Sequence, residues 1–129
     1  MAVDILYQAD VTNRPPKEVL ADWQRAGRSI QPFTEEIVSG VEREQAEIDR
    51  MLGANAEGWT VHRMAVVDRT ILRVACYELG SGTPAAVAVN EAVEAANELS
   101  TADSGRFING VLGRIARTGW DEEGKAEGD

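Results

Sequence analysis

The apolar residues of this chain recur at intervals of three and four positions, and this spacing limits what the chain can fold into more than any other feature. Such spacing places apolar side chains on one face of an α-helix, whereas a half-buried strand would need strict alternation. The chain has 129 residues, which suits one domain with one hydrophobic core. The pattern therefore predicts an all-α, single-domain bundle of about six or seven helices.

Six segments of the sequence carry the helical pattern. They cover approximately residues 2–11, 16–26, 34–52, 66–79, 84–99 and 104–117. The most apolar of them, 66–79, is expected to be the central helix of the core. The connector 54–64 is expected to hold a short helical turn. The start of 84–99 is ambiguous because Val87 and Val89 alternate as in a strand, but we interpret the whole segment as a helix.

Residues at the ends of these segments suggest where the helices begin and end. Thr34 is expected to be the N-cap of the third helix, since its hydroxyl can accept a hydrogen bond from a free backbone N–H. Gly53 is expected to end that helix. Either Asp103 or Ser104 fits the N-cap of the last helix.

The last predicted helix contains residues that the helical pattern does not require. Phe107 lies about 100° around the helix from Ile108, at the edge of the apolar face, and Arg106 precedes it. A half-exposed aromatic ring beside an arginine can stack on an unpaired RNA base, although Phe107 fits a core position equally well. Gly110 and Gly113 each cost about 1 kcal/mol relative to alanine in a helix, which suggests that another helix or a partner lies very close.

The charge distribution argues against nonspecific binding to nucleic acid, because the net charge is −9. Residues 121–129 contain five acids and one lysine, and residues 120–129 are expected to form a disordered acidic tail after a folded domain at 1–119. Residues 61–120 contain six acids and six arginines, so a local basic patch is possible there. The sequence shows neither a signal peptide nor a long apolar run, which favours a cytoplasmic protein without membrane contact.

The residues needed for most kinds of catalysis are scarce. His62 and Cys76 are the only histidine and the only cysteine, so neither a catalytic triad nor a zinc site of the usual kind can be assembled. Cys76 is interpreted as a buried apolar residue and His62 as a surface residue. The glutamates of 91–98 lack the histidine partners of a carboxylate metal site and are interpreted as a solvated face. We expect no enzyme activity, no cofactor and no metal.

Three blocks of sequence resemble the NusB family of bacterial transcription antitermination and ribosomal RNA processing factors. They read VDRTILRVACYEL at 67–79, VAVNEAVEAANEL at 87–99 and DSGRFINGVLGRIA at 103–116, and AVDILYQAD at 2–10 resembles the first-helix block of the family. The resemblance implies an all-helical domain that binds the boxA element of ribosomal RNA leaders. It also implies a heterodimer with the ribosomal protein NusE and a place in the RNA polymerase antitermination complex, with no catalysis.

The same resemblance assigns roles to individual residues. The positions implied for RNA binding are Asp103, Ser104, Arg106 and Phe107, and those implied for the NusE interface or its support are Tyr7, Asp68 and Arg73. Arg69 can serve either RNA or a buried ion pair. The matching residues Asn90, Glu91 and Asn109 are interpreted as capping or packing residues.

The chain departs from the family pattern at its start. Family members usually carry a segment rich in Arg and Lys before the first-helix block, and here Met1 and Ala2 begin that block directly. Because such a segment would supply phosphate contacts, its absence puts RNA binding by this chain in question more than NusE binding. Two alternatives remain: an accessory module of a ribosomal RNA methyltransferase, and a NusE-binding scaffold that binds no RNA. The sequence leaves open whether the chain is a monomer or a homodimer.

Overall fold

The computed structural model describes residues 1–118, and within them every regular element is helical. The elements are α1 (Ala2–Thr12), α2 (Pro16–Arg25), α3 (Pro32–Asn55), the 3-10 turn η1 (Val61–Arg63), α4 (Val66–Gly80), α5 (Ala85–Leu99) and α6 (Ala102–Thr118). The predicted all-α bundle is therefore confirmed, as are the short turn in the connector and the helical interpretation of 84–99. The predicted acidic tail at 120–129 lies outside the described residues.

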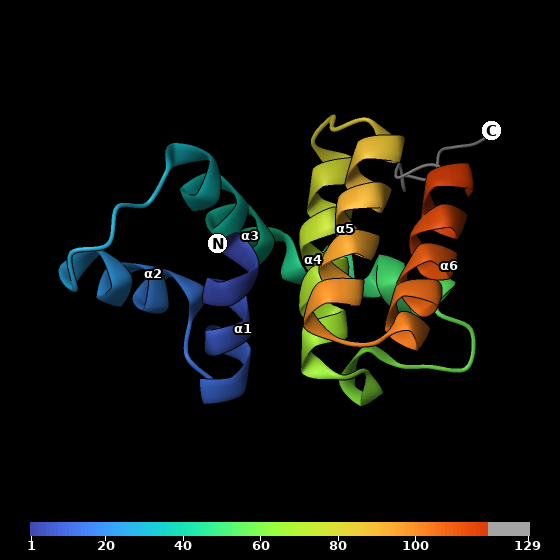
Figure 1. The fold of residues 1–129 in the computed structure, drawn as a ribbon, viewed down its shortest axis with the longest axis horizontal. Helices are drawn as coiled ribbons and strands as arrows, with labels where there is room; N and C mark the ends of the chain where they lie inside the picture. Colours follow the sequence, from blue (N-terminus) through green and yellow to red (C-terminus); the bar gives the residue numbers. More distant parts are fainter. Residues whose placement is uncertain (119–129) are drawn as a thin grey trace.

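The helices form two groups joined by α3 (Figure 1). Helices α4, α5 and α6 lie side by side, while α1 and α2 form the other group with the first half of α3. Glu44 interrupts α3 with a non-helical backbone (φ −107°, ψ 16°), so that the helix contains a kink. Helix α4 packs against α1, α3, α5 and α6, which confirms its predicted central place.

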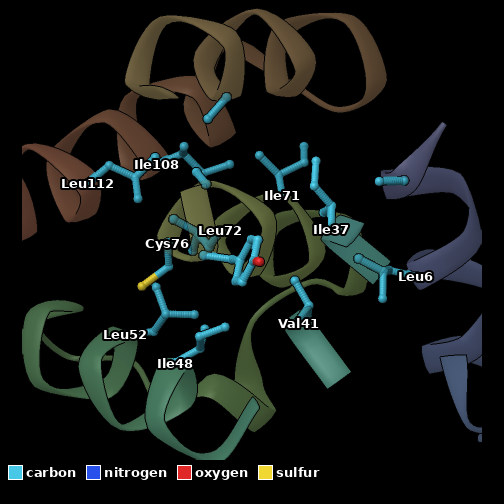
Figure 2. Packing of buried hydrophobic residues seen from close by; sticks show 14 of the residues in the cluster. Leu6, Ile37, Val41, Ile48, Leu52, Ile71, Leu72, Cys76, Ile108 and Leu112 are labelled. Atoms are coloured by element: carbon cyan, nitrogen blue, oxygen red, sulfur yellow. The ribbon is translucent and has the colours of Figure 1, made fainter. Parts of the chain in front are cut away.

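One hydrophobic core runs through both groups of helices. Leu72 of α4 is fully buried in the middle of the residues drawn in Figure 2. Leu6 of α1 approaches from one side, Ile48 from the second half of α3 and Leu112 from α6. Cys76 lies in the same core, and burial raises the pKa of its thiol to about 12, which confirms its interpretation as an apolar residue.

Both predicted ends of the third helix are wrong. Helix α3 begins two residues before Thr34, which is buried inside its first turn. It also continues past Gly53 to Asn55, whose amide donates a hydrogen bond to the carbonyl of Met51 at 2.9 Å. A buried last turn thus outweighs the low helix propensity of an exposed glycine.

The predicted N-cap of the last helix is wrong for a related reason. Helix α6 already begins at Ala102, and both Asp103 and Ser104 lie inside it. The hydroxyl of Thr101 accepts a hydrogen bond from the backbone N–H of Ser104 at 3.0 Å, which is the geometry of an N-cap side chain. The two residues that sequence reasoning proposed as caps are therefore free to take other roles.

The glycines Gly110 and Gly113 have no other helix of residues 1–118 close to them, so that half of the prediction is wrong, while a close partner at these glycines stays a prediction. A side chain at Gly110 would meet no atom of the described chain within 4 Å, and one at Gly113 would meet only Arg117 of the same helix. The close approaches occur instead at Gly40, against the ring of Tyr77, and at Gly105, against the Asn97 amide. In α6 the glycine that allows α5 to approach is thus Gly105.

Candidate functional site

A surface pocket lies where the connector after α3 meets the first turns of α4 and α6. We call it the aromatic pocket, and it is lined by Trp59, Arg63, Met64, Ala65, Asp68, Asp103, Ser104 and Phe107. Three of the four residues implied for RNA binding line this pocket, and the fourth, Arg106, is on the same helical turn of α6. The pocket therefore gathers the predicted RNA residues in one place.

Two aromatic side chains from distant parts of the sequence meet at this pocket. The ring centroids of Trp59 and Phe107 are 6.1 Å apart, and the rings meet edge to face at 63°. Phe107 is half-buried and packs against the core, whereas Trp59 is 47% exposed. Such a pair offers a planar ligand an apolar surface at low entropic cost, because each side chain has only two rotatable bonds.

The pocket also contains a buried carboxylate. Asp68 is 9% exposed, and its Oδ2 accepts a hydrogen bond from the hydroxyl of Ser104 at 3.1 Å. Its Oδ1 has no hydrogen-bond partner among residues 1–118. Asp68 lies in the first turn of α4, where the positive end of the helix dipole favours a negative charge. The resemblance implied Asp68 for the NusE interface, and in the structure Asp68 lines the same pocket as three of the residues implied for RNA binding.

Two arginines lie at the edge of the pocket. Arg106 is exposed and pairs with the exposed Asp103 one turn before it on α6. The guanidinium of Arg63 is exposed and has no ion-pair or hydrogen-bond partner in the described part of the chain. An unpaired guanidinium beside an aromatic surface is suited to hold a phosphate group, with bidentate geometry available.

The other two residues implied for the NusE interface, Tyr7 and Arg73, do not line the aromatic pocket. Tyr7 is 40% exposed on α1, and Val11, one turn later, is 55% exposed. Arg73 is nearly buried and hydrogen-bonds both Asp49 of α3, at 2.9 Å and 3.0 Å, and Asp10 of α1, at 3.2 Å. Of these residues, only those on the outside of α1 are available to a partner, and Arg73 holds α1 in place.

The alternatives for Arg69 are decided by the same cluster. Its guanidinium makes two hydrogen bonds of 2.7 Å to the carboxylate of Asp10, and the side chains are only 18% and 16% exposed. The hydrogen bonds from Arg69, together with the nearby charges of Arg69 and Arg73, lower the pKa of Asp10. Arg69 therefore belongs to a partly buried ion-pair network and is not available for RNA.

Sequence reasoning missed Trp59 and Arg63 because the connector carries no helical pattern. A tryptophan immediately after Gly58 was the available signal, since a large apolar residue in a turn has no core face to explain it. The structure describes no group of three or more His, Cys, Asp or Glu side chains within residues 1–118 that could hold a metal ion. The arrangement can stack a planar group and accept or donate hydrogen bonds.

The sequence of the chain is similar to that of a known protein family. The model of the NusB family matches residues 1–117. The transcription antitermination protein NusB of Salinispora tropica is 44% identical over 121 residues, which cover 89% of each chain. No helix within residues 1–118 is long and apolar enough to cross a membrane.

Two solved structures share the fold. T. maritima NusB superimposes with a TM-score of 0.82 at 28% identity, covering 95% of this chain and 89% of that one. A crystal structure of the antitermination factors NusB and NusE in complex with dsRNA gives a TM-score of 0.79 at 21% identity and covers 90% of each chain.

Proposed function

The chain belongs to the NusB family, and from this we propose that it acts as a transcription antitermination protein that binds RNA and has no catalytic activity. The relative from Salinispora tropica that carries this name matches over nearly the whole chain, which supports a shared role. Such a role places the protein in the cytoplasm, on nascent transcripts.

We propose further that the RNA is the boxA element of ribosomal RNA leaders and that NusE binds beside it. A neighbour of the same fold was crystallised with NusE and double-stranded RNA, which supports the same two kinds of partner for this chain. Together the two proteins would join the RNA polymerase antitermination complex. The surface on α1 around Tyr7 and Val11 is assigned to NusE, because it exposes two apolar side chains one helical turn apart.

The RNA site is assigned to the aromatic pocket, and one observation carries this assignment. Trp59 and Phe107 form a half-exposed aromatic pair beside the guanidinium of Arg63, which has no ion-pair partner among residues 1–118. Single-stranded RNA needs both features, since its bases stack on aromatic rings and its phosphates pair with cations. An overall net charge of −9 makes such a local site necessary, because the whole molecule repels RNA.

Fluorescence anisotropy with a labelled boxA RNA and purified NusE tests the RNA site. We expect Phe107→Leu to weaken binding about tenfold, because leucine keeps the apolar packing but cannot stack on a base. Phe33→Leu is the matched control, since Phe33 is 58% exposed at the start of α3, outside the pocket, and its loss should leave affinity unchanged. Equal affinities for the two variants would contradict the assignment.

Thermal unfolding separates stacking from a purely structural role of Phe107. We expect Phe107→Ala to lower the free energy of unfolding by less than about 3 kcal/mol, because the ring is only half-buried. A loss of stability greater than this, together with normal RNA affinity in variants that carry other large apolar residues at position 107, would mean that Phe107 has only a structural role in the core.

The NusE surface has a separate test. Tyr7→Ala should weaken NusE binding in titration calorimetry and leave the melting temperature nearly unchanged, because the side chain is exposed. Val87→Ala removes an equally exposed apolar side chain from α5 and serves as the control. If only the α5 variant loses NusE binding, the partner surface lies on the other group of helices.

A further inference from the structure

We propose that a pocket where α4 and α6 end is the docking site of Trp120, which follows α6 in the chain. This helix-end pocket has a volume of about 220 Å³ and is lined by Leu79, Thr83, Ala85, Ile115 and Ala116. Pockets for small-molecule ligands usually exceed about 300 Å³, so this one has the size for a single side chain. Gly119 and Trp120 lie outside residues 1–118, and their docking is inferred from the way in which other helices of this chain end.

Helix α1 shows one such end. Asn13, which follows its last helical residue, has a left-handed backbone with φ 57°. The backbone N–H of Asn13 donates a hydrogen bond to the carbonyl of Asp10 at 3.3 Å. The N–H of Arg14 donates another to the carbonyl of Ala9, five positions earlier, at 3.0 Å. These two bonds define the Schellman motif, in which the side chains of the two residues five positions apart often touch.

A second helix end shows this side-chain contact directly. After α2, Gly27 has φ 88°, and the N–H of Arg28 donates a hydrogen bond to the carbonyl of Trp23 at 3.1 Å. The guanidinium carbon of Arg28 lies 4.1 Å from the centroid of the Trp23 ring. The residue that follows such a turn therefore lies against the residue five positions before it.

The sequence at the end of α6 fits the same motif. The last helical residue is Thr118, and Gly119 follows it at the position that needs a left-handed backbone. Glycine adopts this conformation without steric cost. Trp120 then takes the place that Arg14 has after α1, and the residue five positions before Trp120 is Ile115. Because Ile115 lines the helix-end pocket, this contact brings the indole ring to the pocket.

The walls of the pocket suit an indole ring. Ile115 is fully buried and Leu79 is half-buried, while Ala85 and Ala116 are exposed. A ring that covers these side chains removes apolar surface from water. The hydroxyl of Thr83 makes no hydrogen bond within residues 1–118 and can accept one from the indole N–H, which a buried tryptophan needs.

The charges that follow Trp120 complement the end of α6. Arg117 lies in the last turn of α6, is exposed, and has neither an ion pair nor a hydrogen bond within residues 1–118. Asp121, Glu122 and Glu123 come directly after Trp120. Docking of Trp120 holds these acids close to Arg117, whose opposite charge stabilises the docked segment.

Nuclear magnetic resonance of the full chain tests the docking site, with Trp120→Phe used to assign the indole signal. We expect nuclear Overhauser effects between the indole of Trp120 and the methyl groups of Ile115 and Leu79 in the wild-type protein. The backbone N–H of Trp120 should exchange with solvent about tenfold more slowly than in a peptide of residues 114–129, the factor expected for one net hydrogen bond.

Ala116→Glu is the diagnostic variant, because its side chain fills the pocket entrance and its charge repels the acids after Trp120. We expect this variant to lose the Overhauser effects and to exchange the Trp120 N–H at the rate of the peptide. Ala86→Glu is the matched control, since Ala86 is an exposed alanine of α5 that does not line the pocket, and it should change neither result. Circular dichroism melting checks that both variants fold.

The outcomes decide where the indole lies. Absence of the Overhauser effects in the wild-type protein, with exchange at the rate of the peptide, would overturn the docking site without any variant. Unchanged Overhauser effects in Ala116→Glu would also overturn it, because the ring would then lie outside the pocket. Overhauser effects found only between differently labelled chains would assign the pocket to Trp120 of a second copy and overturn docking within one chain.

Discussion

At the scale of single residues, the carboxylates of this protein differ sharply in what surrounds them. Asp103 is exposed and paired with Arg106, Asp68 is buried beside a hydroxyl group, and Glu78 is buried without an ion-pair partner within residues 1–118. The same chemical group therefore has three different energetic roles. Two of these environments lead to measurable predictions.

Asp103 is expected to weaken RNA binding in the wild-type protein. Its carboxylate occupies Arg106 and adds a negative charge at the edge of the aromatic pocket. Asp103→Asn should therefore raise affinity for boxA RNA severalfold and steepen the salt dependence by about one unit if Arg106 then contacts a phosphate. Salt titrations measure RNA affinity for Asp103→Asn and for the double variant Asp103→Asn with Arg106→Ala. If the double variant keeps the gain in affinity, Arg106 is not its cause.

Glu78 is expected to destabilise the folded protein near neutral pH. Burial, and to a smaller extent the charge of Glu91, raise the pKa of Glu78 above its usual 4.5. Since the folded state then binds the proton more tightly than the unfolded state, the destabilisation is absent below about pH 4.5 and grows as pH rises through the folded-state pKa. Glu78→Gln should raise the melting temperature by a few degrees at pH 7.

The pH dependence distinguishes this effect from a general gain in packing. At pH 4 the melting temperatures of wild type and Glu78→Gln should converge, because both side chains are then neutral in the folded state. Glu91→Gln, at an exposed position, should give a smaller gain at pH 7. A gain for Glu78→Gln that is independent of pH would contradict the explanation.

At the scale of helices, α1 is held to the bundle by charge as well as by its apolar face. Asp10 of α1 binds Arg69 and Arg73 of α4, and Arg73 also binds Asp49 of α3, so three helices share one network. The side chains of Asp10, Arg69 and Arg73 are between 13% and 18% exposed, which limits screening by solvent. This network fixes the orientation of the helix that carries the proposed NusE surface.

Removing the central carboxylate should loosen α1. Asp10→Asn leaves two partly buried guanidinium groups without their shared anion, and we expect a loss of about 2 kcal/mol or more in the free energy of unfolding at pH 7. Urea denaturation measures the loss, and hydrogen exchange should show that it is greatest for the amides of α1. Asp4→Asn is the control, since Asp4 is exposed on the same helix and its one ion pair within the described residues is with the terminal amine.

The pH profile of this effect has a defined sign. The pKa of Asp10 is lowered in the folded state from 3.8, so its stabilisation is fully present above about pH 4 and is lost as pH falls through the folded-state pKa. The difference in stability between wild type and Asp10→Asn should therefore shrink in acid. A difference that stays constant down to pH 2 would mean that the network contributes through shape and not through charge.

At the scale of the whole molecule, the two groups of helices share one core, and this predicts a single unfolding transition. Leu72 is fully buried on α4 and touches the core that both groups complete. Leu72→Ala should lower the free energy of unfolding by about 2–5 kcal/mol, and the unfolding midpoints of α1–α3 and of α5–α6 should fall by the same amount. Fluorescence of Trp23, on α2, and far-ultraviolet circular dichroism should report the same midpoint, and separate midpoints would show two independent units.

The sequence predicted the elements well because helix formation depends on a pattern that is local. The spacing of Ile108, Val111, Leu112 and Ile115 was sufficient to identify the buried face of α6, and all four are buried. Helix ends were predicted less well, as Gly53 illustrates, because burial of the last turn against other elements decides where a helix stops. The blocks at 67–79, 87–99 and 103–116 indicated the family, since their order and spacing are properties of the chain itself.

Only the tertiary structure decided which distant residues meet. Trp59 joins Phe107 across 48 positions, and Arg69 joins Asp10 across 59, so neither pair leaves a trace in local spacing. Asp68 likewise accepts a hydrogen bond from Ser104, across 36 positions of the chain. The physical reason is that periodicity fixes which face of a helix is buried, whereas the packing of helices against one another fixes which polar residues at its margins become neighbours.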